Sequence, residues 1–478
     1  MNKNLLSKPL FWLLLGCLLF VLANLRWGLG ILGWIAPIPF LHLLRNNSGQ
    51  RIRLALLLAL PAALTLAVLK IITGSIPAVA ALGYGIPIGI IFSVAFLTWD
   101  LLRKRCDDWR AVLSFPFVMV IAEWAQATFT PLGSWGAVAY TQLENLPVLQ
   151  MASLFGTAGI GWVIYFFAAA FEYAWAFPAK RRLWVSVATV VAVSAHLFGY
   201  ARLSIPVSGE KLIKVAAVGT DATFGGLPLP AAEEISTIEE ALFIRTRKAA
   251  EGGASLVVWN EGATLVESPR EEPFLQILGK LASETKIHLV AAYIKPVHLS
   301  PLLYENKYVW FRPDGSVDHE YLKHEPVPGE PAKRGVGPMN VVNTSFGNAG
   351  GAICYDYDFP RLAMRNAKLG VGIVALLSSD WQGIDPIHTQ MAAIRAIEGG
   401  YSILRSTRMG LSAGIDPHGR IRGWLSSNES ADRILWVTLP VVQQKTLYTK
   451  IQDLLVYIGI TFLLFTGFYA WRQSRMSR

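Results

Sequence analysis

Three side chains in the second half of this 478-residue chain, a carboxylate, an ammonium and a thiol, lie where strand-like runs end. Glu261 follows SLVVWN, Lys323 lies in YLKHEPVPGE, and Cys354 follows GGAI. A cysteine attacks as its thiolate, so it needs a base to take its proton and a cation to steady the negative charge. A carboxylate and an ammonium supply both, and the backbone N–H of Tyr355 is a second donor to an oxyanion. The set predicts acyl transfer through a thioester.

Each of these residues also has a plain structural interpretation. A glutamate after a strand is usually a helix cap or a solvated carboxylate, and a lysine beside a histidine is usually surface charge. A lone cysteine is usually a small buried apolar residue. Cys17 and Cys106 lie in different parts of the chain from Cys354, so no disulfide framework is expected. The joint pattern, not any single residue, favours a catalytic site.

The elements that must position these residues form an α/β pattern. Strand-like runs alternate with helical patterns, which is typical of a sheet covered on both faces. In such sheets, polar side chains just past the strand ends meet at one edge. The expected strands are Ile213–Gly219, Ser255–Trp259, Ile287–Tyr293, Gly351–Cys354, Val371–Leu377, Tyr401–Ser406 and Leu411–Asp416, and the expected helices are Ala231–Ala250, Pro269–Thr285 and His388–Glu398.

The composition places the remaining segments in a membrane. Hydrophobic residues make up 53% of the chain and charged residues only 16%. Most of the apolar segments approach the roughly 20 residues that cross a bilayer core. A cleaved signal peptide is the rival interpretation of the first one. The eight expected spans are Leu10–Asn24, Trp27–Leu44, Leu54–Thr73, Pro77–Leu102, Ala111–Phe129, Gln150–Phe177, Leu183–Ala201 and Leu454–Trp471.

Basic residues gather in every second loop. The loop 130–149 between spans five and six has no Lys or Arg. The positive-inside rule therefore predicts both termini in the cytoplasm and the large segment between spans seven and eight outside it. The basic residues that set this orientation are Lys3, Lys8, Arg45, Arg51, Arg53, Arg103, Lys104, Arg105, Arg110, Lys180, Arg181, Arg182, Arg472, Arg475 and Arg478.

Several other function classes are disfavoured. The net charge of +10 is explained by the membrane topology, and no zinc-finger, RNA-binding or P-loop pattern is present, so no nucleic-acid partner is expected. The histidines lack metal-ligand spacing, so neither a metal nor a cofactor is expected. Arg395 and Glu398 lie one helical turn apart and are interpreted as a structural ion pair. Glu123 and Glu172 fall within expected spans, where a buried charge is often functional.

The motifs carry a resemblance. WNEGA, YLKHEPVPGE and AICYDYDFP are similar to the three motifs of the nitrilase (carbon–nitrogen hydrolase) superfamily, in the same order. The block from SSDWQGIDP to DPHGRI is similar to the superfamily's C-terminal motifs. The resemblance implies an αββα sandwich with Glu261 as base, Lys323 as oxyanion and thiolate partner, and Cys354 as nucleophile. It also implies that Glu330 supports the site. The supporting or substrate-binding set is completed by Tyr355, Asp356, Asp380 and Trp381.

Seven spans, a nitrilase-like domain outside and one more span resemble the apolipoprotein N-acyltransferase family, nearly over the whole chain. That resemblance implies a membrane helical bundle over 1–204, a catalytic domain over 205–448, and a last helix with a cytoplasmic tail over 449–478. It implies location in a bacterial cytoplasmic (inner) membrane. The implied partners are the lipid bilayer, a phospholipid acyl donor and a diacylglyceryl-cysteine lipoprotein, whose α-amino group accepts the chain.

Four departures from the family pattern keep alternatives open. Asn260 replaces a proline, PVPGE is one residue shorter and lacks an aromatic, Asp356 replaces a glutamate, and 379–383 reads SDWQG. An enzyme with the same triad acting on a different amine or amide is therefore the second hypothesis. A membrane scaffold or transporter with a decayed domain is the third, and the retention of all three triad residues argues against it.

Overall fold

The computed structural model describes residues 8–47, 49–74, 76–207, 211–220, 222, 224 and 226–476. It divides into two compact units, one helical and one α/β. The helical unit comprises the residues up to Ile205 and those from Lys450, and the α/β unit is Pro206–Thr449. Lys3 and Arg478, which contribute to the orientation argument, lie outside the described residues.

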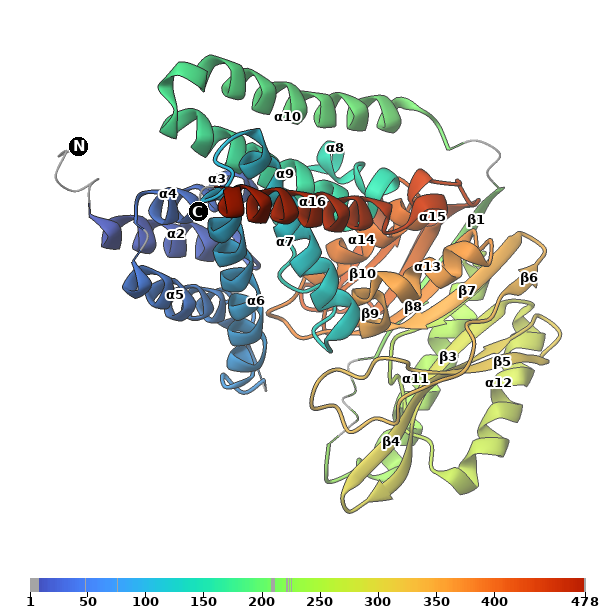
Figure 1. The fold of residues 1–478 in the computed structure, drawn as a ribbon. Coiled ribbons are helices and arrows are strands. Elements are labelled where there is room, and N and C mark those ends of the chain that lie inside the picture. The colour runs from blue at the N-terminus through green and yellow to red at the C-terminus, as the bar shows by residue number, and fades with distance from the viewer. Residues whose placement is uncertain are drawn as a thin grey trace. The chain divides into compact units, whose positions relative to one another are not determined.

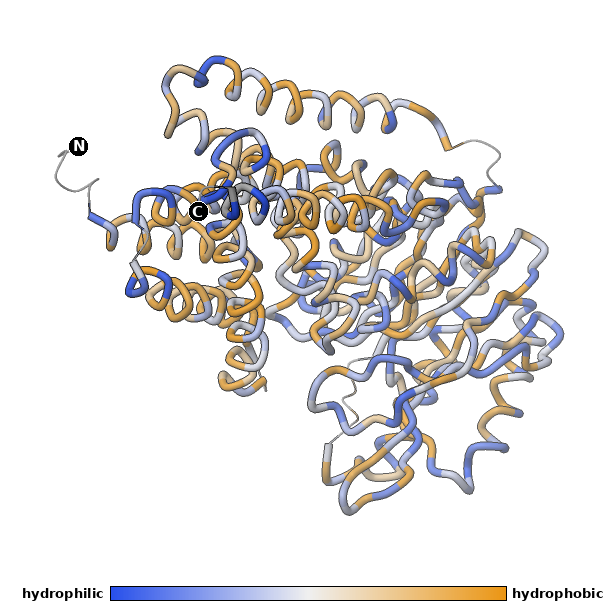
Figure 2. The backbone as a smooth tube through the Cα atoms, in the orientation of Figure 1, coloured by the Kyte–Doolittle hydropathy of each residue, from blue (hydrophilic) through white to orange (hydrophobic). Residues whose placement is uncertain are grey.

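The helical unit is built from long apolar helices (Figure 1). Apolar residues dominate these helices along their length (Figure 2). Six of the described helices are long and apolar enough to cross a membrane, α5, α6, α7, α9, α10 and α16. The helices of this unit are α2 (Pro9–Ala23), α3 (Gly30–Ile35), α4 (Ile38–Asn46), α5 (Gln50–Leu69), α6 (Ala80–Arg103), α7 (Trp109–Phe129), η1 (Val138–Gln142), α8 (Leu146–Leu149), α9 (Ala152–Ala176), η2 (Pro178–Lys180), α10 (Arg181–Ser204) and α16 (Leu454–Met476).

The second expected span is not one continuous helix. It forms α3 and α4, which are separated at Ala36 and Pro37. Proline lacks a backbone N–H and disfavours a helical conformation in the residue before it, so a helix is readily interrupted there. The first span, α2, has only 15 residues. The structure therefore confirms a set of helices long enough to span a membrane. That the chain crosses the membrane eight times stays a prediction.

Ion pairs join the helix ends of this unit on one side. Arg45 at the end of α4 donates to Glu172 of α9 at 2.7 Å and to Asp107, in the α6–α7 loop, at 2.6 Å. Asp100 near the end of α6 accepts from three basic side chains, Arg53, Arg103 and Lys104. Lys180, in the next basic loop, donates to the hydroxyl of Tyr173, which is next to Glu172, at 3.2 Å. Three of the expected cytoplasmic loops therefore meet at one end of the helices. Glu172 is accounted for by this structural role.

Glu123 has a different structural role. It accepts a hydrogen bond from the Tyr165 hydroxyl at 2.6 Å and another from the Val138 backbone N–H at 2.9 Å. A buried polar group must be hydrogen-bonded, and here the bonds fasten η1 to α7 and α9. The Glu123 side chain therefore holds the loop 130–149, which has no Lys or Arg, in place.

The α/β unit contains two six-stranded sheets. The first has the order β12-β1-β2-β3-β4-β5, and the second has the order β11-β10-β9-β8-β7-β6. β1, β2 and β3 are parallel, as are β7, β8 and β9. The strands are β1 (Lys211–Val218), β2 (Leu256–Trp259), β3 (His288–Leu299), β4 (Leu302–Phe311), β5 (Val317–Leu322), β6 (Val342–Thr344), β7 (Gly347–Ile353), β8 (Ile373–Ser379), β9 (Ser402–Arg408), β10 (Leu411–Ile415), β11 (Ile421–Ser426) and β12 (Ile434–Val441).

The sheets pack face to face and helices cover their outer faces. In β2, Leu256 and Val258 join the core between the sheets, whereas Val257 and Trp259 join the core under the helices. This alternation follows from the two-residue period of a strand and confirms the expected αββα sandwich. The helices of the unit are α11 (Ala232–Glu251), η3 (Ser268–Arg270) and α12 (Glu271–Thr285) on the first sheet, and η4 (Cys354–Asp358), α13 (Pro360–Lys368) and α14 (Ile387–Gly399) on the second, followed by α15 (Leu447–Ile451) at the unit boundary.

All seven expected strands and all three expected helices are present, with ends shifted by a few residues or, for β3, extended. The elements that were not expected are β4, β6, β11, β12, α13 and α15. β4 contains Glu305, Asn306 and Lys307 in succession, which hides its apolar alternation. The expected Arg395–Glu398 ion pair is confirmed, with 2.8 Å between Nη1 and Oε2.

A substitution at Gly351 of β7 tests how closely the two sheets pack. A Cβ at this position would overlap the buried hydroxyl of Tyr308, which lies in β4 of the other sheet. We expect Gly351→Ala to lower the free energy of unfolding by about 1–3 kcal/mol, as overpacking does. Tyr308→Phe should restore part of the loss in the double variant. Thermal unfolding of the purified protein measures both, and Gly337→Ala, which has open space around its Cβ, is the neutral control.

Candidate functional site

Lys323 lies at the centre of the site. It follows β5, which runs in the same direction as β3, so it reaches the edge where the other strands end. Its Nζ lies 2.7 Å from Oε1 of Glu261 and 2.8 Å from Oε2 of Glu330, and its side chain is almost wholly buried. Burial opposes the charged form, but the two carboxylates outweigh it and hold the pKa of Lys323 well above its ordinary value. The lysine is therefore a fixed cation.

Glu261 is positioned by a turn at the end of β2. The backbone N–H of Asn260 continues the β1 pairing by donating to Val218 at 3.1 Å. The Asn260 side chain accepts from the Thr220 N–H at 2.8 Å and donates to the Glu261 carbonyl at 2.9 Å. Asn260 thus ties the turn together with its side chain, at the position where the family pattern has proline.

Glu330 and Asn306 complete the acidic side of the site. Glu330 accepts from Lys323, from the Val327 N–H at 2.8 Å and from the Asn306 amide at 3.0 Å. The same Asn306 amide nitrogen donates to Glu261 at 2.7 Å. Although burial opposes ionisation, Lys323 and these donors hold the pKa of Glu330 below its usual value. Asn306 therefore keeps two like-charged carboxylates side by side, and no motif had drawn attention to it.

Cys354 directly follows β7, as the first residue of η4, and has a strained backbone conformation. Its φ is +44°, in the left-handed region that non-glycine residues rarely adopt. Its sulfur lies 3.6 Å from the Ser379 carbonyl oxygen. Burial, followed by the Glu261 carboxylate, raises the pKa of the thiol well above its ordinary value, and Lys323 acts in the opposite direction. The resting thiol is therefore neutral, and reaction requires a base to remove its proton.

Asp356 connects the cysteine turn to the lysine loop. Its Oδ2 accepts from the Ile353 N–H at 3.1 Å and from the Tyr321 hydroxyl at 2.8 Å. Its Oδ1 accepts from the N–H groups of His324 and Glu325 at 3.0 and 2.8 Å. One buried carboxylate thus holds the residue before Cys354 and the two residues after Lys323. This bridging role explains why an acid is needed here.

A pocket of about 180 Å³ opens onto these residues. Glu261, Lys323, Glu330 and Cys354 all line it. Of the other expected support residues, Tyr355, Asp356, Asp380 and Trp381 are absent from the described lining. Tyr355 packs its ring edge-on against Phe359, 5.4 Å away. The remaining lining residues, Phe224, Gly262, Ile294, Tyr304, Asn306, Val327, Ser379 and Arg408, come mostly from loops and strand ends.

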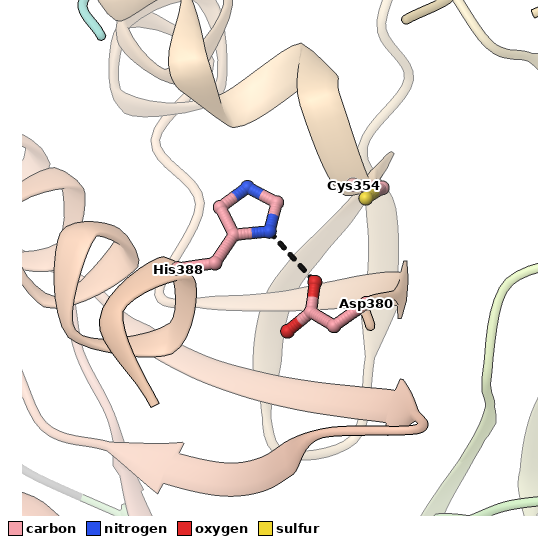
Figure 3. Close-up of side chains that lie close together, drawn as sticks. All are labelled: Cys354, Asp380 and His388. Atoms are coloured by element: carbon pink, nitrogen blue, oxygen red, sulfur yellow. Dashed lines mark hydrogen bonds and ion pairs between the residues drawn. The ribbon is translucent and has the colours of Figure 1, made fainter. Parts of the chain in front are cut away.

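Asp380 lies in a buried charged network rather than in the pocket lining. It follows β8 and contacts His388 of α14 at 2.7 Å (Figure 3). Arg405 of β9 donates to both of its oxygens, at 2.9 and 3.0 Å. Cys354, Asp380 and His388 have ligand atoms within 4.8 Å of one another, which is close enough to consider a metal site. Because the guanidinium already occupies the carboxylate, this donor set does not suit a cation.

Comparisons with known proteins cover both units. Residues 214–445 match the carbon-nitrogen hydrolase family, and residues 16–170 match the apolipoprotein N-acyltransferase N-terminal domain. An apolipoprotein N-acyltransferase of Shewanella oneidensis is 27% identical over 447 residues, covering 86% of this chain and 81% of that protein. The one from Bradyrhizobium diazoefficiens is 29% identical over 404 residues, covering 76% and 73%. A crystal structure of an amidase from Nesterenkonia sp. is 18% identical, with a TM-score of 0.40, and covers 52% of this chain and 95% of the amidase.

The strained turn at Cys354 gives a prediction about stability. Glycine adopts a positive φ freely, whereas alanine is disfavoured there by about 1–2 kcal/mol. Both Cys354→Gly and Cys354→Ala remove the sulfur, so their stabilities differ mainly by the cost of the positive φ at this position. We expect the glycine variant to unfold at the higher temperature of the two. Equal midpoints in thermal unfolding would show that the turn carries no such strain.

Proposed function

Because this chain belongs to the apolipoprotein N-acyltransferase family, within the carbon–nitrogen hydrolase superfamily, it is an acyltransferase of lipoprotein maturation, and we propose that Cys354 carries the acyl group. The observation that supports this assignment best is the buried Lys323, held between Glu261 and Glu330 beside the cysteine in one pocket. We assign Glu261 as the base, Lys323 as the partner of the thiolate and oxyanion, and Cys354 as the nucleophile.

The first half-reaction forms a thioester. Glu261 takes the thiol proton as the sulfur attacks the ester carbonyl carbon of a phospholipid. The tetrahedral oxyanion is stabilised by the Lys323 ammonium and the backbone N–H of Tyr355. The C–O bond to the glycerol then breaks, and Glu261 returns the proton to the departing alkoxide. A lysophospholipid leaves, and the acyl chain stays on sulfur.

The second half-reaction transfers the chain to nitrogen. The neutral α-amino group of a diacylglyceryl-cysteine lipoprotein attacks the thioester carbonyl, and Glu261 takes a proton from the nitrogen. The C–S bond breaks, the sulfur leaves as the thiolate, and the proton on Glu261 restores the thiol. The apolar lining residues Phe224, Ile294 and Val327 suit an acyl chain. Glu330, which carries no proton in this scheme, keeps Lys323 charged and in place.

The membrane arrangement is also part of the proposal. The protein lies in the inner membrane. We assign residues 1–204 to the membrane bundle, 205–448 to the catalytic domain on the periplasmic side, and 449–478 to the last helix and a cytoplasmic tail. The meeting of three basic loops at one end of the helical unit supports this orientation, as does the positive-inside rule.

The acyl-enzyme is tested by mass spectrometry. The full-length protein in detergent, mixed with a phospholipid carrying a labelled acyl chain, should gain one acyl mass on the Cys354 peptide. Cys354→Ala should abolish the adduct, and Glu261→Gln should slow its formation by about 10²–10⁴-fold, the typical contribution of a general base. Cys106→Ala is the matched control and should label normally. Labelling that persists in Cys354→Ala would rule out this nucleophile.

The acceptor is tested separately by complementation of a strain depleted of its lipoprotein N-acyltransferase. We expect growth with the wild-type protein and none with Cys354→Ala at equal expression. A protein that forms the thioester but does not restore growth would point to the alternative, a membrane-anchored enzyme that acts on a different amine or amide.

The orientation is tested by cysteine labelling. In a protein without its own cysteines, Lys280→Cys in the catalytic domain should react with a membrane-impermeant maleimide in intact spheroplasts. Arg181→Cys, at the start of α10, should react only after the membrane is permeabilised. Both positions are exposed, so reagent access differs only by side. The opposite labelling pattern would place the catalytic domain in the cytoplasm.

A further inference from the structure

A group of charged residues lies close to the Cys354 sulfur and takes no part in the reaction scheme above. An Asp380 oxygen, a His388 ring nitrogen and the sulfur are all within 4.8 Å of one another (Figure 3). All three side chains are buried. At that separation, charges in a protein interior shift each other's pKa appreciably. The charges of Asp380 and His388 therefore affect how readily the Cys354 thiol loses its proton.

His388 is held from both ring nitrogens. Nδ1 lies 2.7 Å from Asp380 Oδ1, and Nε2 lies 3.2 Å from Asp358 Oδ1. An Arg405 nitrogen also lies 2.9 Å from Nδ1. Two carboxylate oxygens thus face the two ring nitrogens, and both contacts become hydrogen bonds when each nitrogen carries a proton. The two carboxylates therefore favour the imidazolium, against the nearby Arg405 guanidinium.

The electrostatic environment agrees with the geometry. Burial disfavours the charged ring, but Asp358 and Asp380 outweigh it and raise the pKa of His388 to about 9. Arg405 and Asp380 in turn hold each other ionised. The four side chains therefore carry two positive and two negative charges, which sum to zero beside the sulfur.

We propose that this four-residue network keeps the environment of Cys354 electrically neutral, with His388 as the positioning residue that offsets the carboxylates of Asp380 and Asp358. The proposal rests on the proposed function, because it concerns the thiolate that attacks the acyl donor. Without the imidazolium, two carboxylates face one guanidinium, and the net negative charge opposes thiolate formation. Removal of one carboxylate has the reverse effect.

Charges reach the sulfur from every element that packs around it. Glu261 after β2 and Lys323 after β5 act from the pocket side, with Glu330 behind Lys323. Asp380 after β8, His388 on α14, Arg405 on β9 and Asp358 at the end of η4 form the network. Arg408 of β9 also lines the pocket beside Cys354. The network can be changed without touching the proposed base or the ammonium.

The pH dependence of Cys354 alkylation tests the proposal directly. The full-length protein in detergent is treated with iodoacetamide between pH 6 and 10, and peptide mass spectrometry follows Cys354 separately from Cys17 and Cys106. We expect His388→Gln to displace the profile upward by about one pH unit, the lower end of the effect of a neighbouring charge. The rate at neutral pH should fall about threefold, because a more basic thiolate is also more nucleophilic.

Removal of a negative charge from the network, instead of a positive one, supplies the decisive comparison. Asp380→Asn should displace the profile to lower pH, and Asp358→Asn serves the same purpose if Asp380→Asn does not fold. Arg395→Gln removes a buried cation from the same helix and should leave the profile in place. Unchanged profiles, or displacement of the His388 and aspartate variants in the same direction, would overturn the proposal. Alkylation needs no lipid, so this result is independent of whether an acyl adduct forms.

Discussion

The site depends on one buried cation between two carboxylates. Lys323 cannot lose its charge while Glu261 and Glu330 lie within 2.8 Å of its nitrogen, and neither carboxylate tolerates burial without the lysine. Breaking such a pair leaves an uncompensated charge, so the three residues must be delivered together. Much of the α/β unit can be understood as the means of bringing β2, β5 and the loop after β5 to the same edge.

One carboxyl group outside the triad connects this cation to the nucleophile, and a second lies close to the sulfur. Asp356 bonds the turn that carries Cys354 and the loop that carries Lys323, so a shift of either would be transmitted to the other. Asp380 pairs with His388 and Arg405 close to the sulfur. The strained turn at Cys354 is therefore surrounded by groups that resist relaxation, and strain persists only where its surroundings determine it.

Two of the four departures from the family pattern, Asn260 and Asp356, have local explanations. Asn260 secures its turn through side-chain hydrogen bonds. Asp356 reaches four donors although it is one methylene shorter than glutamate. These substitutions therefore leave the arrangement of the acidic, basic and thiol groups complete. In the helical unit, Glu172 is paired with Arg45, and Glu123 accepts hydrogen bonds from Tyr165 and the Val138 N–H, so each has a structural role.

The sequence by itself determined the membrane helices, the alternation of strands and helices, and the order of Glu261, Lys323 and Cys354. These features are written in local patterns, namely long apolar runs, two-residue and 3.6-residue periods, and polar residues after strands. Only the tertiary structure decided the roles of Asn306, Asp356 and His388. Each of them has a partner 30 to 45 residues away, and no local period reports which distant groups share a hydrogen bond.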